Sequence, residues 1–225
     1  MIWAYAIVEA ARAPLPRVRG LEDTPLDIVE LRDAGVIVSR HAGSEPPRWS
    51  HEAMLTHEAV VEALLSSRAV MPLRFGTVMP DDGALVRALE EQAQDWPALL
   101  ERVRGRVEIA VTVPAPASDE ESAEQPAAAD GRSYLLDKVA RRRAAVEIVG
   151  RLDAAVETLA EAATVRIQPD PEVAVKAAYL VRRVDAARAR GLLEEAVPGA
   201  VSTGPWPPYS FTTAERLGAT EGATA

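Results

Sequence analysis

The stretch Val107-Glu-Ile-Ala-Val-Thr-Val113 alternates aliphatic residues with smaller or polar ones. This alternation predicts a half-buried β-strand. Further along, residues 134–163 carry apolar side chains at steps of three and four, or sums of these, as on one face of a helix. The stripe consists of Leu135, Val139, Val146, Val149, Leu152, Val156 and Leu159. The sequence therefore predicts a strand followed by one long amphipathic helix.

Downstream of this helix the pattern returns to strands. Residues 164–168 and 173–181 flank the turn Pro169-Asp-Pro171, which predicts a hairpin. Asp185 can cap a second helix that runs to Val197, where Pro198-Gly199 ends it, and Val201 opens a last extended segment. The order β-α-β-β-α-β is the ferredoxin-like arrangement.

Residues 114–130 separate the first strand from the long helix. They include five acids and no base, and no aromatic or large aliphatic residue. Such a segment cannot offset the entropy lost on ordering, so we expect a disordered acidic insertion within the second domain. The acids are Asp119, Glu120, Glu121, Glu124 and Asp130.

The first hundred residues predict a related α+β unit. The expected elements are a strand at 2–8, a hairpin of 28–31 and 36–40, a helix at 51–67, a strand at 69–78, and a helix at 83–103 interrupted near Trp96-Pro97. The fold class is thus α+β with two domains, residues 1–105 and 106–211, followed by a flexible tail at 212–225.

Composition excludes several classes of protein. The chain has no cysteine, which excludes disulfides and thiolate metal sites, and its net charge of −9 argues against a nucleic-acid partner. No stretch reaches the roughly 18 apolar residues of a membrane span, so we expect a soluble cytoplasmic protein with no lipid membrane partner. His51 and His57 lie six apart rather than four, so surface histidines are expected rather than a zinc site.

Other charged residues also have an ordinary structural interpretation. Asp81-Asp82 and Glu194-Glu195 are expected at a helix start and on a helix surface, and Arg141-Arg142-Arg143 on a solvated helix face. Arg74, in Met71-Pro-Leu-Arg-Phe-Gly-Thr-Val78, is expected to clamp strand to helix through a carboxylate, the alternative being a binding site. Gly76 is expected to mark a bulge or a close backbone approach. No nucleophile elbow or phosphate loop occurs, so we predict no catalytic, cofactor-binding or metal residue.

The segment Gly204-Pro-Trp-Pro-Pro-Tyr-Ser-Phe211 is the most distinctive of the chain. Its prolines remove backbone donors and favour polyproline II geometry, which excludes a central strand. Trp206 and Tyr209 would then share one side and serve as packing anchors, or else bind a partner.

The chain resembles the gas vesicle protein F/L family (GvpF/GvpL). The resemblance rests on 204–211 together with Tyr5-Ala-Ile-Val8, His57-Glu-Ala-Val-Val61, Met71-Pro-Leu-Arg-Phe-Gly-Thr77, Gly105-Arg-Val-Glu108 and Gly131-Arg-Ser-Tyr-Leu-Leu136. It implies two α+β domains and a non-enzymatic accessory protein without cofactors, either a minor component of the gas vesicle or an assembly factor. The implied partners are the hydrophobic shell protein and other accessory proteins.

A small-molecule-binding regulatory or enzymatic α+β module is the alternative, because ferredoxin-like folds host many functions. It would require a pocket with converging polar groups, and the sequence shows no such cluster.

Overall fold

The computed structural model describes residues 1–9, 14–42, 45, 48–92, 95–115, 131–167 and 172–212. The chain forms two compact units, residues 1–106 with the segment from 207 onward, and residues 107–206. Residues 207–211, which the sequence pattern placed in the second domain, are thus grouped with the first unit. The predicted acidic insertion, the Pro169-Asp-Pro171 turn and the tail fall on 116–130, 168–171 and 213–225, outside the described residues.

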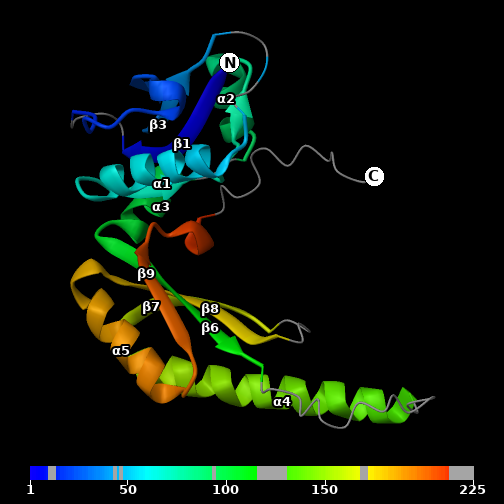
Figure 1. Cartoon of the computed structure of the whole chain (residues 1–225). Coiled ribbons are helices and arrows are strands. Elements are labelled where there is room, and N and C mark those ends of the chain that lie inside the picture. Colours follow the sequence, from blue (N-terminus) through cyan, green and yellow to red (C-terminus); the bar gives the residue numbers. More distant parts are fainter. Residues whose placement is uncertain are drawn as a thin grey trace. The chain divides into compact units, whose positions relative to one another are not determined.

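The first unit contains a five-stranded antiparallel sheet (Figure 1). Its strands are β1 (Ile2–Glu9), β2 (Leu26–Glu30), β3 (Ala34–Arg40), β4 (Val70–Pro72) and β5 (Val78–Met79). The order is β2-β3-β1-β4, and β5 also pairs with β1. The predicted first strand and the β2–β3 hairpin are confirmed, with β3 beginning at Ala34 rather than Val36.

The helices of this unit are α1 (His51–Leu65), α2 (Asp82–Glu90) and α3 (Trp96–Val103). The side chains of Ser50, Asp81 and Asp95 each cap one of them by accepting a backbone N–H. The single interrupted helix predicted at 83–103 is therefore two helices. The break precedes Trp96, and Pro97 lies in the first turn of α3, where its missing N–H costs nothing.

Strand β1 is buried on both faces. Its register with β3 slips between Ala4 and Ala6, so that Ile7 rather than Ala6 joins Ala4 in the core formed with α2 and α3. Trp3 and Tyr5 alternate with these residues and face α1 instead, where both rings meet His57 of that helix. The sheet therefore has helices on both faces.

The second unit has the predicted element order. Its elements are β6 (Arg106–Pro114), α4 (Gly131–Val156), β7 (Ala160–Arg166), β8 (Val173–Arg182), α5 (Ala186–Ala196) and β9 (Val201–Trp206). The sheet order is β7-β8-β6-β9, and β7 and β8 form the predicted antiparallel hairpin. Helices α4 and α5 pack against each other and on β8, and so cover the same face of this sheet.

The long helix is shorter than predicted. It ends at Val156, and the residues expected to be its last turns belong to β7, whose Ala160 pairs with Val181. The alanines of this segment favour a helix by propensity, so pairing with β8 overrides local preference. Among the described side chains of α4, the buried ones all lie in its second half: Ala145, Leu152 and Val156.

Helix α5 begins and ends near the expected residues, but its start is stabilised differently. Asp185 occupies the N-cap position without accepting a cap hydrogen bond, and its carboxylate instead pairs with Arg182 at 2.6 Å. The chain leaves the helix through Gly199, whose φ of +83° suits glycine.

The predicted polyproline strip at 204–211 is not continuous. Gly204 to Trp206 complete β9, an edge strand beside β6, and Tyr209–Phe211 form a short 3-10 turn. Gly204 has a φ of +116°, and a Cβ atom there would lie 2.7 Å from the carbonyl oxygen of Glu108. Trp206 is 45% exposed and donates to Thr203, so the prediction that it is a buried packing anchor is wrong.

Candidate functional site

The segment between β4 and β5 is a turn rather than the continuous strand predicted at 69–78. Gly76 has a φ of +86°, and both the amide and the hydroxyl of Thr77 donate to the carbonyl of Arg74, at 3.1 and 2.7 Å. The left-handed glycine and this closed turn break the strand pairing. The close approach expected at Gly76 is confirmed, whereas the turn itself was not predicted. Arg74 and Phe75 therefore lie at an edge of the sheet, between the two segments, β4 and β5, that pair with β1.

A series of rings leads from the core of the first unit to this turn. Phe75 packs on buried Trp3 and His57, with ring centroids 5.1 and 5.7 Å apart. Trp49 packs edge-on against Phe75 at 5.6 Å and lies over Gly76, where a Cβ atom would come within 2.4 Å of its ring. Trp49 is nevertheless 69% exposed. A large aromatic side chain is thus held at the surface by a rigid base.

His57 belongs to this base and is not a surface residue, contrary to the prediction. Its Nδ1 accepts from the indole N–H of Trp3 and its Nε2 donates to the carbonyl of Leu73, both at 3.1 Å. These two bonds fix the neutral tautomer. Burial disfavours the charged imidazole and lowers its pKa to about 4. The neutral ring therefore connects β1, α1 and the turn.

The expected clamp at Arg74 is absent. The side chain is exposed and makes no ion pair or hydrogen bond within the described ranges of the chain. Sequence reasoning placed Arg74 inside a strand, where a guanidinium would need a partner, and the turn removes that requirement. Arg74 precedes Phe75 in the turn, and its exposed guanidinium is unpaired within the described residues. We refer to Trp49, Arg74, Phe75 and Gly76 as the aromatic surface.

A second group of polar residues in the same unit resembles a hydrolase triad in its distances. The hydroxyl of Ser39 lies 2.8 Å from His41 Nε2, and His41 Nδ1 lies 3.0 Å from the carboxylate of Glu22. Ser39 is fully buried, however, and its hydroxyl also bonds to that of Tyr5 at 2.8 Å. A substrate carbonyl cannot reach this oxygen, so the group serves to satisfy buried polar atoms.

Tyr5 continues this chain of hydrogen bonds to the backbone. Its hydroxyl accepts from the amide of Leu21 at 2.8 Å, and burial raises the pKa of the phenol. A Cβ atom on Gly20 would lie 2.6 Å from the Tyr5 oxygen. The network therefore holds the Gly20 loop against the sheet.

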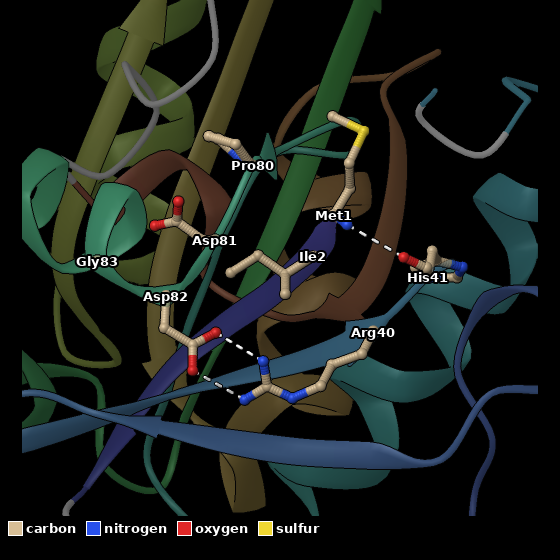
Figure 2. Close-up of a pocket in the computed structure, with 8 residues that line it drawn as sticks. All are labelled: Met1, Ile2, Arg40, His41, Pro80, Asp81, Asp82 and Gly83. Carbon is tan, nitrogen blue, oxygen red and sulfur yellow. Dashed lines mark hydrogen bonds and ion pairs between the residues drawn. The ribbon is translucent and has the colours of Figure 1, made fainter. Parts of the chain in front are cut away.

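A shallow hollow of about 600 Å³ lies beside this network (Figure 2). Its lining residues are Met1, Ile2, Arg40, His41, Pro80, Asp81, Asp82 and Gly83. The guanidinium of Arg40 is fully engaged, with two bonds to Asp82 at 2.7 and 2.9 Å and one to Asp27 at 2.9 Å. The bonds from Arg40 lower the pKa of both carboxyls. With the Arg40 and Asp82 charges already paired with each other, these two side chains offer a ligand little.

The remaining charged positions lie where predicted. Asp81 and Asp82 are at the start of α2, Glu194 and Glu195 are on α5, and residues 141–143 are exposed on α4. Asp82 is not a freely solvated charge, because it pairs with Arg40. Among the described residues no group of three or more His, Asp or Glu side chains is placed to hold a metal ion. No helix in the same ranges is long and apolar enough to cross a bilayer.

Comparison with known sequences gives a match over nearly the whole chain. Residues 1–213 match the family "Gas vesicle synthesis protein GvpL/GvpF". Gas vesicle protein L of Streptomyces sp. (strain CB03234) is 35% identical over 185 residues, covering 72% of this chain and 70% of the relative. Gas vesicle protein F of the same strain is 25% identical over 236 residues, covering 93% and 98%.

Two crystal structures have the same fold. GvpF from Anabaena sp. PCC7120 superposes with a TM-score of 0.72 over 95% of both chains, at 18% sequence identity. GvpF from Microcystis aeruginosa also gives 0.72, over 93% of this chain and 98% of that one, at 14% identity. Two antiparallel sheets and an α+β architecture are therefore shared with solved gas vesicle proteins. The chain belongs to the GvpL/GvpF family of gas vesicle proteins.

Proposed function

We propose that this protein is a non-enzymatic accessory protein of the gas vesicle, either a minor component or an assembly factor. It binds the hydrophobic shell protein and limits aggregation of that protein while the vesicle forms. Its place of action is the gas vesicle and the surrounding cytoplasm, and other accessory proteins are further partners. Membership of the gas vesicle family supports this role, and the aromatic surface supplies a means of binding.

The observation that carries the proposal is the exposure of Trp49 on a rigid base. Exposed, pre-positioned aromatic side chains lose little conformational entropy on binding and commonly dominate the energy of interfaces. Phe75 and Gly76 fix the indole, and the exposed Arg74 of the same turn can bond to polar groups of a partner. The surface is thus suited to a partner that is apolar at the centre and polar at the edge.

A shell protein that encloses gas has such a surface. One of its faces must be apolar, and before assembly this face is exposed to water and prone to aggregate. A partner that covers the face with an aromatic anchor would keep the subunits apart until they join the wall. The binding must also be reversible, which favours a small anchored contact over a large interface.

The test combines a pull-down with light scattering, using purified shell protein and the full chain at micromolar concentration. The intact protein should bind shell protein and slow the rise in scattering. Trp49→Ala should weaken both effects by about tenfold, the loss typical of an aromatic anchor. Trp206→Ala, which removes an exposed indole from the other unit, is the matched control. Absence of binding by the intact protein, or equal loss in both variants, would refute the proposal.

A small-molecule-binding or enzymatic role is the competing hypothesis. The paired charges of the hollow in Figure 2 and the inaccessible Ser39 hydroxyl both weigh against it. A metabolite that strongly raised the melting temperature in a thermal-shift screen would instead favour it.

We also propose that the second unit is a ferredoxin-like domain and that residues 1–105 and 106–211 are the two domains. The element order and the sheet order β7-β8-β6-β9 support the first assignment. The boundary between the compact units at Arg106 supports a division near residue 105, whereas residues 207–211 are grouped with the first unit.

A further inference from the structure

On one side of α4, between Leu135 and Val146, apolar side chains are covered by nothing within the described chain. Leu135 is 60% exposed, Val139 64% and Val146 54%. With 3.6 residues per turn these three lie on one line, roughly a quarter of a turn away from the side that docks through Leu152 and Val156. Figure 1 shows the first turns of α4 extending past the strands of the second unit. The stripe is therefore separate from the core.

The spacing of this stripe is that of a coiled-coil seam. Leu135, Val139, Arg142, Val146 and Val149 follow one another at steps of four, three, four and three residues. Such steps place side chains at the contact positions of a two-helix seam. Three aliphatic residues in a narrow line suit one partner helix, and Leu136, also 60% exposed, occupies a position that flanks this line. A membrane-surface helix would have a broader apolar face with aromatic residues, which this stretch lacks.

The charges around the seam are positive. Arg142 lies in it, and Lys138 and Arg143 occupy the two flanking positions that set partner choice in coiled coils. Lys138 and Arg142 make no ion pair within the described residues, and Arg143 has only a 3.6 Å contact with Glu147. All three are exposed. A partner helix must therefore supply acidic groups opposite the seam and on both of its sides.

We infer that residues 135–149 of α4 dock an acidic amphipathic helix of another protein. A second copy of this chain is disfavoured, because pairing two α4 helices in either direction brings flanking cations against flanking cations. This inference goes beyond the shell-binding role, since it concerns a surface in the other unit and a partner of different chemistry. It stands or falls independently of the aromatic surface.

The test uses two synthetic helical peptides with leucine at the seam positions, one with glutamate and one with lysine at all flanking positions. Fluorescence anisotropy with the full chain should show binding of the glutamate peptide at least about tenfold tighter than the lysine peptide. Val139→Asp should weaken that binding by about tenfold, because it places an acid against apolar and acidic groups. Val184→Asp, at an 84% exposed valine outside α4, should leave it unchanged.

Charge reversal gives the sharpest readout. Arg142→Glu combined with Lys138→Glu and Arg143→Glu should transfer the preference to the lysine peptide, which loss of folding could not produce. Equal binding of the two peptides, or an unchanged preference after reversal, overturns the inference. Two other results would also overturn it, in each case if Val139→Asp abolishes the effect. Binding to phosphatidylglycerol vesicles would assign the stripe to lipid, and dimerisation in sedimentation would assign it to a second copy of the chain.

The same variants separate this inference from the proposed function. The α4 substitutions should leave the shell-protein assay unchanged, and Trp49→Ala should leave peptide binding unchanged. Loss of peptide binding in Trp49→Ala would overturn the assignment of the peptide site to α4.

Discussion

The first unit covers its sheet on both faces, whereas in the second unit both helices pack on one face and half of α4 packs on nothing described. In the first unit Trp3, Tyr5 and Ile7 on a single strand are all fully buried. In the second, apolar side chains of α4 are exposed on one side of the helix, as at Val139, and buried on another, as at Leu152. A periodic apolar pattern in the sequence therefore predicts a surface that can be buried. Whether that surface is buried depends on the elements that pack against it.

This contrast separates residues that support the fold from residues available to partners. The aromatic surface combines both, because buried Trp3 and His57 support exposed Trp49 through Phe75. The exposed part of α4 has no such base, and its side chains can change without loss of core packing. The two regions should consequently respond differently to substitution.

The largest expected effect is at Trp96 in the core of the first unit. Trp96 is 7% exposed and packs in the cluster formed by α2, α3 and the sheet. Trp96→Ala should lower the free energy of unfolding by about 3–5 kcal/mol, because it removes a buried aromatic and leaves a cavity. Urea denaturation followed by circular dichroism measures it.

Trp206→Ala is the matched comparison in the second unit. The sequence pattern predicted that this side chain is a packing anchor. With the side chain 45% exposed, we expect at most about 1 kcal/mol. Equal losses at the two tryptophans would contradict the contrast between the units.

The second effect is a pH dependence that arises from His57. Its folded-state pKa of about 4 lies below the ordinary value of 6.5, so the unfolded chain binds the proton more readily between these values. The contribution of His57 to the free energy of unfolding should be fully present above pH 6.5. It should be lost as the pH drops towards 4, by about 3 kcal/mol in total. Denaturation curves at a series of pH values measure this slope.

His57→Gln isolates the contribution of the histidine from those of the carboxyls. Glutamine does not titrate and retains an amide donor and acceptor for Leu73 and Trp3. The difference in free energy of unfolding between the wild type and the variant should therefore become smaller as the pH falls from 6.5 to 4. Parallel pH curves for the two proteins would show that burial of His57 has no linkage to folding.

The smallest effect tests the backbone at two glycines of the second unit. Gly204→Ala should cost about 1–3 kcal/mol, because φ is +116° and the added Cβ would meet the Glu108 carbonyl. Gly150, within α4, has nothing within 4 Å of an added Cβ, and Gly150→Ala should stabilise by about 0.5–1 kcal/mol. Thermal melts of both variants check the opposite signs. If both substitutions lowered the melting temperature, this would show that α4 is constrained along its whole length.

Much of the element order could be predicted from periodicity. The strands at Ile2–Glu9 and Arg106–Pro114 and the two hairpins were recognisable because their pattern is strong and their ends are marked by turn residues. The end of α4 was not, because alanine-rich residues after Val156 fit a helix locally and become a strand only by pairing with β8. The turn at Gly76 was missed for a similar reason, since the apolar residues around it continue a strand pattern.

The candidate site was only partly accessible from sequence. The stretch Met71–Thr77 was recognised as unusual, but Arg74 was assigned a carboxylate partner that the described structure does not contain. The packing of Trp49 over Gly76 joins residues far apart in the chain, and no local pattern reports such a contact. His57 was expected at the surface because its burial depends on contact with the indole of Trp3, a residue far away in the sequence.

The sequence by itself determined the α+β class, the order of strands and helices, and membership of a gas vesicle family through its motifs. Those properties follow from side-chain periodicity, turn residues and local identity, which are carried within a few residues of each position. Tertiary structure alone decided which apolar residues are buried and which are presented, as at Trp49, Trp206 and the seam of α4. Burial depends on what other segments supply opposite each side chain, and that information is distributed over the whole chain.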